Sequence, residues 1–296
     1  MNKLIVITGT TACGKSDLAV ELAERFGAEV VSADSRQVFR GLDLGSGKIT
    51  AEEMRGVPHH LLDVAEPGDY FSLSDFQSLA YEAIDDIFKR GGKAFLVGGT
   101  GLYINAVVDG YNLHESRPDP ILRRETEEKS LEELIEILKD KDPGALERVD
   151  IKNKRRVERA VEKALCGRTG ENPSIPRYES LVLGVTYDRE TVYERIGVRL
   201  DRRLEQGMID EVRNLRESGV SDEFLYKLGL EYRYILMYLR GEFPDYEAFR
   251  NKLFMEIRHL AKEQMTWFRK RSDIHWLDMS ADPVEEASRL IADFCH

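Results

Sequence analysis

The sequence predicts an α/β protein: a doubly wound parallel sheet with a phosphate-binding loop (P-loop) and an inserted helical lobe. Three observations predict this fold. Short β-branched runs alternate with apolar repeats of helical spacing, a glycine-rich loop follows the first run, and the strand pattern disappears from about residue 117 to 176. We therefore expect a catalytic core over residues 1–116 and 177–296 and a helical insertion over residues 117–176.

Each expected strand is a short, mostly apolar run beside glycine or a polar turn. Such runs occur at Leu4–Thr8, Glu29–Ala33, Ala94–Val97, Leu181–Thr186 and Ile274–Leu277. Because ligands of a doubly wound sheet collect at the carboxyl ends of its strands, we expect Thr10–Ser16, Asp34–Gln37 and Gly98–Thr100 to converge on one crevice.

Helices are expected wherever apolar residues recur at three- and four-residue spacing. Ser74 followed by Gln77 predicts a capping box for the helix before Gly91. Two helices are expected in the insertion and two long amphipathic helices after it: Leu131–Asp140, Lys154–Leu165, Thr191–Glu217 and Asp245–Arg271.

Composition excludes several classes of protein. The 296 residues have a formal net charge of −11, which argues against a general nucleic-acid binder. No apolar run reaches the roughly 18 residues of a membrane span, and the N-terminus lacks a secretory signal, so a cytosolic protein without a membrane partner is expected. The three cysteines are far apart and form no CxxC pair, so neither a disulfide framework nor a zinc site is indicated.

The strongest motif is Gly9–Ser16, which matches G-x-x-x-x-G-K-[ST] between an expected strand and an expected helix. The motif typically binds a diphosphate through successive backbone N–H groups, a lysine cation and the helix N-terminus. The predicted diphosphate-binding residues are Thr11, Ala12, Cys13, Gly14, Lys15 and Ser16. Ser16 is also the predicted ligand of Mg²⁺.

The residues at the ends of the two strands expected beside the P-loop help to distinguish between the possible activities. The run Phe95–Val97 ends in Gly-Gly-Thr, so the carboxylate that holds Mg²⁺ in nucleotide hydrolases is missing there. Asp34 ends the preceding strand and is the carboxylate expected to face the P-loop. It could support a metal site, bind a substrate hydroxyl as in an ATP-consuming small-molecule kinase, act as a general base, or order a turn.

Seven segments together resemble the ordered signatures of the tRNA dimethylallyltransferase family, also called tRNA isopentenyltransferases. They are GTTACGKS (9–16), ADSRQVFRGLDLGSGK (33–48), VPHHLLDV (57–64), VGGTGLYI (97–104), DIKNKRRVERAVE (150–162), RRLEQGMIDEVRNL (202–215) and HLAKEQMTWFRK (259–270). The resemblance covers nearly the whole chain. It implies transfer of a dimethylallyl group from dimethylallyl diphosphate to N6 of an adenine beside the anticodon of tRNA.

The resemblance also implies roles for single residues. Asp34 would accept the proton from N6, and Thr100 would reach the diphosphate or the reacting centre from the opposite strand end. Ser35 and Gln37 would recognise the adenine. Arg195, Arg199 and Arg202 recur at spacings of four and three, so they are expected on one face of a helix. Arg199 is the expected diphosphate contact, and a helical salt bridge with Glu194 or Asp201 is the alternative. The expected tRNA-binding cations lie in the insertion: Arg123, Lys154, Arg155, Arg156 and Arg159.

Other features have less specific interpretations. Adjacent His59 and His60 point in opposite directions in an extended segment, which favours structural hydrogen bonds over a metal site. Trp267 and Trp276 are expected in the core. The segment Leu228–Arg233 (LGLEYR) departs from the family's Gly-Tyr-Lys/Arg pattern by placing an acid where a cation is expected.

Three alternatives to tRNA prenylation remain open at this point. The chain could prenylate a free adenine nucleotide, phosphorylate a small molecule with ATP, or bind RNA without catalysis. A monomer that recognises a tRNA anticodon stem-loop is the expected state.

Overall fold

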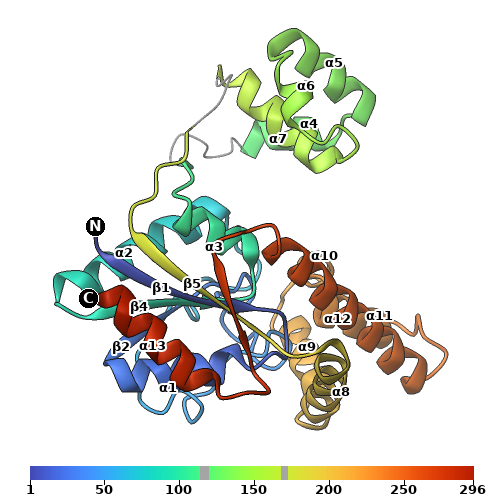
Figure 1. The fold of residues 1–296 in the computed structure, drawn as a ribbon. Coiled ribbons are helices and arrows are strands. Elements are labelled where there is room, and N and C mark those ends of the chain that lie inside the picture. The colour runs from blue at the N-terminus through green and yellow to red at the C-terminus, as the bar shows by residue number, and fades with distance from the viewer. Residues whose placement is uncertain (114–119, 168–172) are drawn as a thin grey trace. The chain divides into compact units, whose positions relative to one another are not determined.

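The computed structural model describes residues 1–113, 120–167 and 173–296 (Figure 1). The chain divides into two compact units, Met1–Asp109 with Pro176–His296, and Gly110–Ile175. Each unit has hydrophobic clusters of its own. The boundary expected between residues 116 and 117 lies outside the described residues.

The first unit is built on a parallel sheet in the order β3-β2-β4-β1-β5-β6. The strands are β1 (Lys3–Gly9), β2 (Ala28–Ser32), β3 (His59–His60), β4 (Lys93–Gly98), β5 (Glu179–Thr186) and β6 (Ile274–Asp278). In the centre Ile5 pairs with Phe95 on β4 and with Leu181 on β5. The predicted doubly wound parallel sheet is therefore confirmed. The edge strand β3 is too short for an alternating pattern to reveal it.

Helices cover both faces of this sheet (Figure 1). Alternate residues of β1 face opposite sides, so Ile5 and Ile7 pack with α1 (Lys15–Phe26) and α13 (Pro283–Cys295). Leu4 and Val6 share the other cluster with α2 (Leu73–Lys89) and α3 (Gly101–Val108).

The capping box of α2 lies two residues before the predicted position. Ser72 Oγ accepts from the Asp75 N–H at 3.1 Å, and the Asp75 carboxylate accepts from the Ser72 N–H at 2.9 Å. Ser72 has the extended backbone that an N-cap requires, whereas Ser74 is already inside the helix. The predicted Ser74–Gln77 box is wrong. Gln77 is instead buried and donates to the Ala106 carbonyl at 2.7 Å, which joins α2 to α3.

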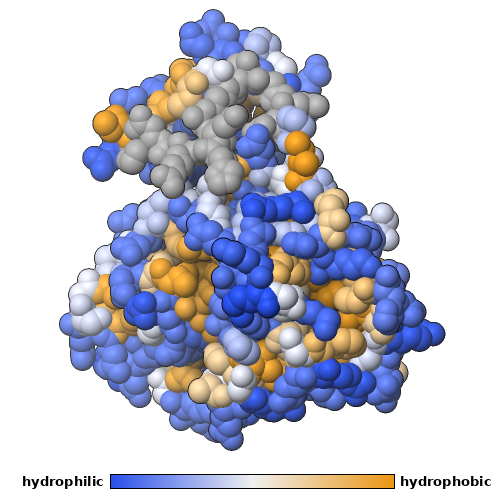
Figure 2. Space-filling model, turned by 90° about the vertical axis from the view of Figure 1, so that its left-hand side faces the viewer, coloured by the Kyte–Doolittle hydropathy of each residue, from blue (hydrophilic) through white to orange (hydrophobic). Residues whose placement is uncertain are grey.

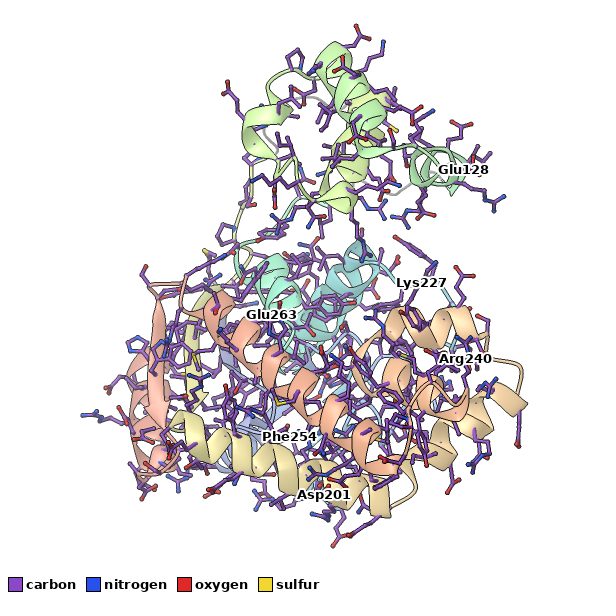
Figure 3. All side chains as sticks on the ribbon, turned by 90° about the vertical axis from the view of Figure 1, so that its right-hand side faces the viewer. Glu128, Asp201, Lys227, Arg240, Phe254 and Glu263 are labelled. Atoms are coloured by element: carbon purple, nitrogen blue, oxygen red, sulfur yellow. The ribbon has the colours of Figure 1, made fainter. Side chains whose placement is uncertain are left out.

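A group of helices with its own apolar cluster completes the first unit. It contains α8 (Arg189–Glu205), α9 (Met208–Glu217), α10 (Asp222–Leu228), α11 (Leu230–Leu239) and α12 (Tyr246–Phe268). The single helix predicted over Thr191–Glu217 is wrong, because Gly207 adopts a left-handed φ of 97° and separates α8 from α9. α8 lies beside α12 (Figure 3), where Asp201 accepts two hydrogen bonds from Arg250 at 2.8 and 2.6 Å.

The second unit is helical. It contains α4 (Pro120–Glu127), α5 (Leu131–Lys141), α6 (Ala145–Arg148) and α7 (Lys154–Leu165). Leu134 and Leu138 of α5 pack against Val157 and Val161 of α7 in one apolar cluster.

The coloured residues on the face shown in Figure 2 are largely hydrophilic, with apolar residues in separate patches. Among residues 1–113, 120–167 and 173–296, no helix has both the length and the apolar character needed to cross a bilayer.

Candidate active site

A pocket of about 340 Å³ lies in the first unit where β1, β2 and β4 end. Its lining includes residues from the P-loop, from the segment after β2 and from the segment after β4, so the three predicted segments do meet. Helices α8, α11 and α12 supply further lining residues that include Arg199, Glu231 and Gln264. The site therefore joins the sheet to the C-terminal helices.

Three residues of the P-loop, Thr11, Lys15 and Ser16, line this pocket, whereas residues 12–14 do not. Gly14 is the N-cap of α1 with a left-handed φ of 82°, which directs the chain from the loop into the helix. Lys15 Nζ donates to the Thr10 carbonyl at 3.3 Å, and Ser16 at the start of α1 is exposed in the pocket wall. Cys13 is fully buried in the core and does not line the pocket.

Gln264 on α12 links the P-loop to the segment after β4, and sequence reasoning did not single it out. Its Oε1 accepts from the Thr11 N–H at 2.8 Å, while its Nε2 donates to the Gly99 carbonyl at 2.9 Å. The Thr11 amide is thereby occupied, which leaves the Thr11 hydroxyl for a ligand. A single glutamine on a long amphipathic helix carries no local signal that marks such a role.

Asp34 and Thr100 are brought together by the ends of β2 and β4. Asp34 Oδ1 accepts from the backbone N–H groups of Arg36 at 2.9 Å and Gln37 at 3.3 Å, so this oxygen orders the turn. Thr100 Oγ1 accepts from the Ser35 N–H at 3.2 Å. Gly98 permits this approach, because a Cβ there would collide with the Ala33 carbonyl. Among the described residues, Asp34 Oδ2 accepts no hydrogen bond, and Asp34 lines the pocket.

Ser35 and Gln37 line the pocket but differ in their free polar atoms. Both ends of the Gln37 amide are bonded: Oε1 accepts from Ser32 Oγ, and Nε2 donates to the Gly47 carbonyl, each at 3.2 Å. The Ser35 hydroxyl lies 3.5 Å from Thr100 Oγ1. Gln37 therefore forms part of the pocket wall with both ends of its amide already bonded, whereas the Ser35 hydroxyl is better placed to contact a nucleobase.

The arginines of α8 reach different parts of the site. Arg195 Nε donates to the Ala12 carbonyl of the P-loop at 2.8 Å, and Arg199 Nη2 donates to the Gly47 carbonyl at 3.2 Å. Burial, reinforced by the neighbouring Arg203 cation, lowers the pKa of Arg199. Arg202 is exposed like Arg195 and is absent from the pocket lining. Arg203, on the buried side of α8 with Ile196 and Leu200, lines the pocket instead.

The acid of the unusual LGLEYR segment has a cationic partner. Glu231 is 6% exposed and pairs with Arg203 at 3.3 Å, and both side chains line the pocket. Trp267 also belongs to the pocket lining, although it packs against the core as predicted.

The two histidines serve the fold. His59 Nδ1 lies 2.8 Å from the Val57 carbonyl oxygen and His60 Nε2 lies 2.7 Å from Glu29 Oε2. Structural hydrogen bonding is therefore confirmed. Within the part of the chain that the structure describes, no group of three His, Cys, Asp or Glu side chains could hold a metal ion.

The basic residues of the insertion fall into two sets. Lys154, Arg155 and Arg156 at the start of α7 are exposed. Arg123 and Arg159 approach the largely buried carboxylate of Glu162 from α4 and α7. Lys154 and Arg156 also have acidic partners, Glu158 at 3.6 Å and Asp150 at 3.8 Å, but both cations are exposed and so can meet phosphates.

Comparison with known proteins assigns the chain to a family. The sequence model described as IPP transferase matches residues 37–271, and a second one, described as Isopentenyl transferase, matches residues 2–66. The chain belongs to the IPP transferase family. The resemblance seen in the sequence motifs is thereby confirmed.

Relatives of this IPP transferase are similar over nearly their full length. The tRNA dimethylallyltransferase 2 of Shewanella sediminis is 42% identical, with 98% of each chain covered. The crystal structure of the tRNA isopentenylpyrophosphate transferase from Bacillus halodurans is 40% identical, with a TM-score of 0.77 and coverage of 99% of this chain and 97% of that one. A eukaryotic dimethylallyltransferase solved while acting on tRNA has a TM-score of 0.83 at 22% identity, covering 99% and 79% of the two chains, and shows the shared fold.

Proposed function

We propose that this IPP transferase moves a dimethylallyl group from dimethylallyl diphosphate to N6 of the adenosine beside the anticodon of tRNA. The main support for the roles proposed below is that P-loop residues and Asp34 line the same pocket of about 340 Å³. A diphosphate and the acceptor amine could therefore be held within one small volume. The activities of the relatives support the choice of substrates.

The P-loop side of the pocket would hold the diphosphate. Lys15, the Ser16 hydroxyl and the N–H groups at the start of α1 supply cationic and donor groups for its oxygens. Arg199 would add a second cation from the opposite wall. Because the bond between the allylic carbon and oxygen breaks as negative charge develops on the leaving diphosphate, these groups stabilise the transition state more than the bound substrate.

Magnesium fits this site only with help from the substrate. Ser16 would supply the protein oxygen that ligates the ion, and among the described residues no group of three His, Cys, Asp or Glu side chains could hold a metal. Diphosphate oxygens and water would complete the coordination, as is usual for Mg²⁺. The ion would supply additional neutralisation of the leaving group.

Asp34 would complete the reaction as the general base. The N6 lone pair forms the new bond to the allylic carbon, the carbon–oxygen bond breaks, and diphosphate departs. Asp34 Oδ2 accepts the proton that N6 loses, while Oδ1 remains bonded to the Arg36 and Gln37 amides and fixes the orientation of the carboxylate. Thr100, which holds Ser35, would border the reacting centre.

The helical insertion would bind the tRNA backbone. Exposed Lys154, Arg155 and Arg156 occupy the first turn of α7 and present three adjacent cations. Enzymes that modify a base in a loop take that base into a pocket while cations contact the phosphates, so a net acidic protein can still act on an anticodon stem-loop. We propose a cytoplasmic, monomeric enzyme.

A labelling experiment tests the proposal. The protein is incubated with labelled dimethylallyl diphosphate, Mg²⁺ and either unmodified tRNA or AMP, and in parallel with ATP and candidate small-molecule acceptors. Label in tRNA supports the proposed function. Label in AMP alone would instead indicate a nucleotide prenyltransferase, and phosphate transfer from ATP would indicate a kinase.

A further inference from the structure

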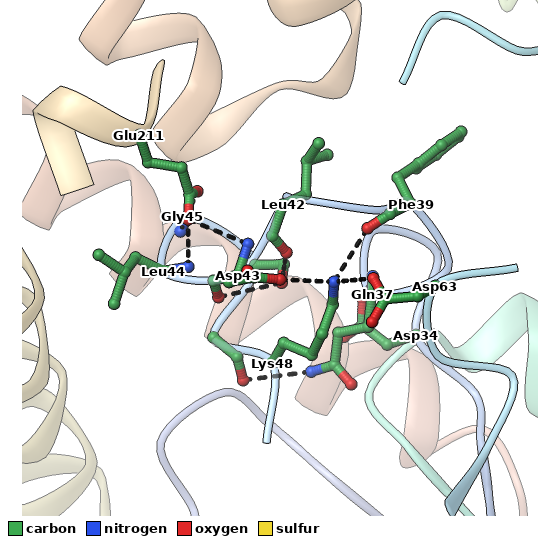
Figure 4. Close-up of polar contacts among 12 residues, drawn as sticks. Asp34, Gln37, Phe39, Leu42, Asp43, Leu44, Gly45, Lys48, Asp63 and Glu211 are labelled. Carbon is green, nitrogen blue, oxygen red and sulfur yellow. Dashed lines mark hydrogen bonds and ion pairs between the residues drawn. The ribbon is translucent and has the colours of Figure 1, made fainter. Parts of the chain in front are cut away.

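The carboxylate of Glu211 on α9 fills a nest of backbone donors in a distant loop (Figure 4). It accepts from the N–H groups of Asp43 at 3.0 Å, Leu44 at 2.6 Å and Gly45 at 2.9 Å. The hydroxyl of Tyr232 on α11 donates to Glu211 Oε1 at 3.0 Å. Four donors thus converge on one carboxylate, and consecutive amides of this kind favour an anion.

The loop held by Glu211 continues directly into the pocket wall. Gly45, Ser46 and Gly47 line the pocket, whereas Glu211 is absent from the lining. The Gly47 carbonyl accepts from Gln37 Nε2 and from Arg199 Nη2, each at 3.2 Å. This single carbonyl therefore sets the positions of two side chains that arise from opposite walls.

Residues 43–48 form no helix or strand, so the loop keeps its geometry through individual contacts. Within the loop, the Gly47 N–H donates to the Leu44 carbonyl at 3.1 Å and the Lys48 N–H donates to the Asp43 carbonyl at 2.9 Å. Besides Glu211, Lys48 anchors the loop to its surroundings through Nζ, which contacts Asp43, Asp63 and the Phe39 carbonyl (Figure 4). A side chain at Gly47 would collide with the Arg199 guanidinium, so the loop and Arg199 are in close contact. A displacement of the loop would therefore be transmitted directly to Arg199.

We infer that Glu211 is a positioning residue of the prenyl-transfer site: by holding the amides of residues 43–45 it fixes the Gly47 carbonyl, which holds Arg199 against the diphosphate. The inference rests on the proposed function for the role of Arg199. Glu211 itself touches neither substrate. A glutamine at this position keeps the size of the side chain but replaces one acceptor oxygen with an NH₂ group that faces backbone donors.

The first test compares Glu211→Gln with Glu217→Gln, an exposed glutamate on the same helix. We expect Glu211→Gln to lower kcat for tRNA prenylation by about 10–100-fold, because small misplacements of a catalytic group cost that much. The affinity for tRNA should change less than about twofold, and circular dichroism should show a folded protein. Equal kcat values for the two variants would overturn the inference.

A double-mutant cycle with Arg199→Lys tests the route through Arg199. If Glu211 acts through that side chain, adding Glu211→Gln to Arg199→Lys should lower kcat by less than about threefold further, since coupled residues are not additive. Losses that multiply in full would overturn the inference.

A binding measurement separates this inference from the proposed function. Calorimetry with inorganic diphosphate and Mg²⁺ needs no transfer, and Glu211→Gln should weaken that binding by about tenfold while Glu217→Gln leaves it unchanged. Unaltered diphosphate binding in Glu211→Gln would count against the positioning role. Failure of the unaltered protein to prenylate tRNA would instead count against the proposed function.

Discussion

Arg203 and Glu231 form a buried ion pair in the wall of the pocket. Arg203 Nη1 lies 3.3 Å from Glu231 Oε1, and the two side chains are only 10% and 8% exposed. The other two nitrogens of the Arg203 guanidinium, Nε and Nη2, are buried without an acceptor among the residues that the structure describes. The acid of the LGLEYR segment therefore compensates a second buried arginine one turn beyond Arg199 on α8.

This ion pair predicts that the single substitution lowers the free energy of unfolding more than the double substitution does. Arg203→Met alone leaves Glu231 buried without its cation, and we expect it to lower the free energy of unfolding by about 3 kcal/mol. The double variant Arg203→Met, Glu231→Leu should recover most of that loss. Urea unfolding measures both values, and a double variant as unstable as the single one would contradict the pairing.

Asp34→Asn should separate chemistry from binding. The amide cannot accept the N6 proton, so we expect kcat to fall about 10²–10⁴-fold. It keeps an oxygen for the Arg36 and Gln37 amides, so tRNA affinity should stay within about twofold. Single-turnover labelling and a filter-binding assay measure the two quantities, with exposed Asp293→Asn on α13 as the control. Unchanged single-turnover chemistry would remove the base assignment.

Gln264→Ala should impair the donor-substrate site. The substitution removes the bonds to the Thr11 N–H and the Gly99 carbonyl, which join the P-loop to the segment after β4. We expect the KM for dimethylallyl diphosphate to rise about tenfold, in proportion to two hydrogen bonds of ordinary strength. Steady-state kinetics compares it with Gln206→Ala, a change at an exposed position. A KM equal to that of the control would show that the bridge is dispensable.

The contacts of Glu29 with Arg90 and His60 predict that the stability of the fold depends on pH. Hydrogen bonds from Arg90, opposed by desolvation and aided by His60, lower the pKa of Glu29 to about 2. A carboxylate with a lowered pKa stabilises the folded state fully above its unfolded value of about 4.5, and this contribution disappears as the pH falls toward 2.

The measurement for this cluster is thermal unfolding of Glu29→Gln across pH. At pH 7 we expect a loss of about 1 kcal/mol, a modest value because Arg90 is half exposed and its charge is screened. The difference from the unaltered protein should shrink below pH 4. Glu21→Gln on α1, at an exposed position, should show no such dependence.

The cations at the start of α7 predict a change in the salt dependence of tRNA binding. Replacing Lys154, Arg155 and Arg156 with serine should lower the slope of log affinity against log salt by about 2–3, since each lost phosphate contact removes about 0.7–0.9. Replacing Lys129, Lys139 and Lys141 with serine in the same insertion provides a control of equal charge. Identical slopes for the two triple variants would exclude the first turn of α7 as a phosphate contact.

Local sequence determined the parts of this protein that depend on neighbouring residues. The P-loop motif, the five longer strands and α7 could be predicted because glycine spacing, β-branched runs and helical repeats act over a few residues. Local patterns predicted the wrong residue or boundary in two places. Two serines, Ser72 and Ser74, could each cap α2, and the structure uses Ser72. Gly207 interrupts an otherwise continuous helical pattern and separates α8 from α9.

Tertiary structure decided how the pocket is closed. Gln264, Glu211 and the Arg203–Glu231 pair act on segments more than 25 residues away in sequence, so no periodicity or local motif marks them. Arg203 rather than Arg202 faces the pocket because burial of α8 depends on the helices packed against it. The sequence alone specified a phosphate loop with its lysine and a carboxylate at the end of a parallel strand, and the family resemblance pointed to Arg199. Only packing of the C-terminal helices onto the sheet brought Arg199, Arg203 and the loop of residues 43–48 to the same pocket, because such contacts exist only once distant segments meet.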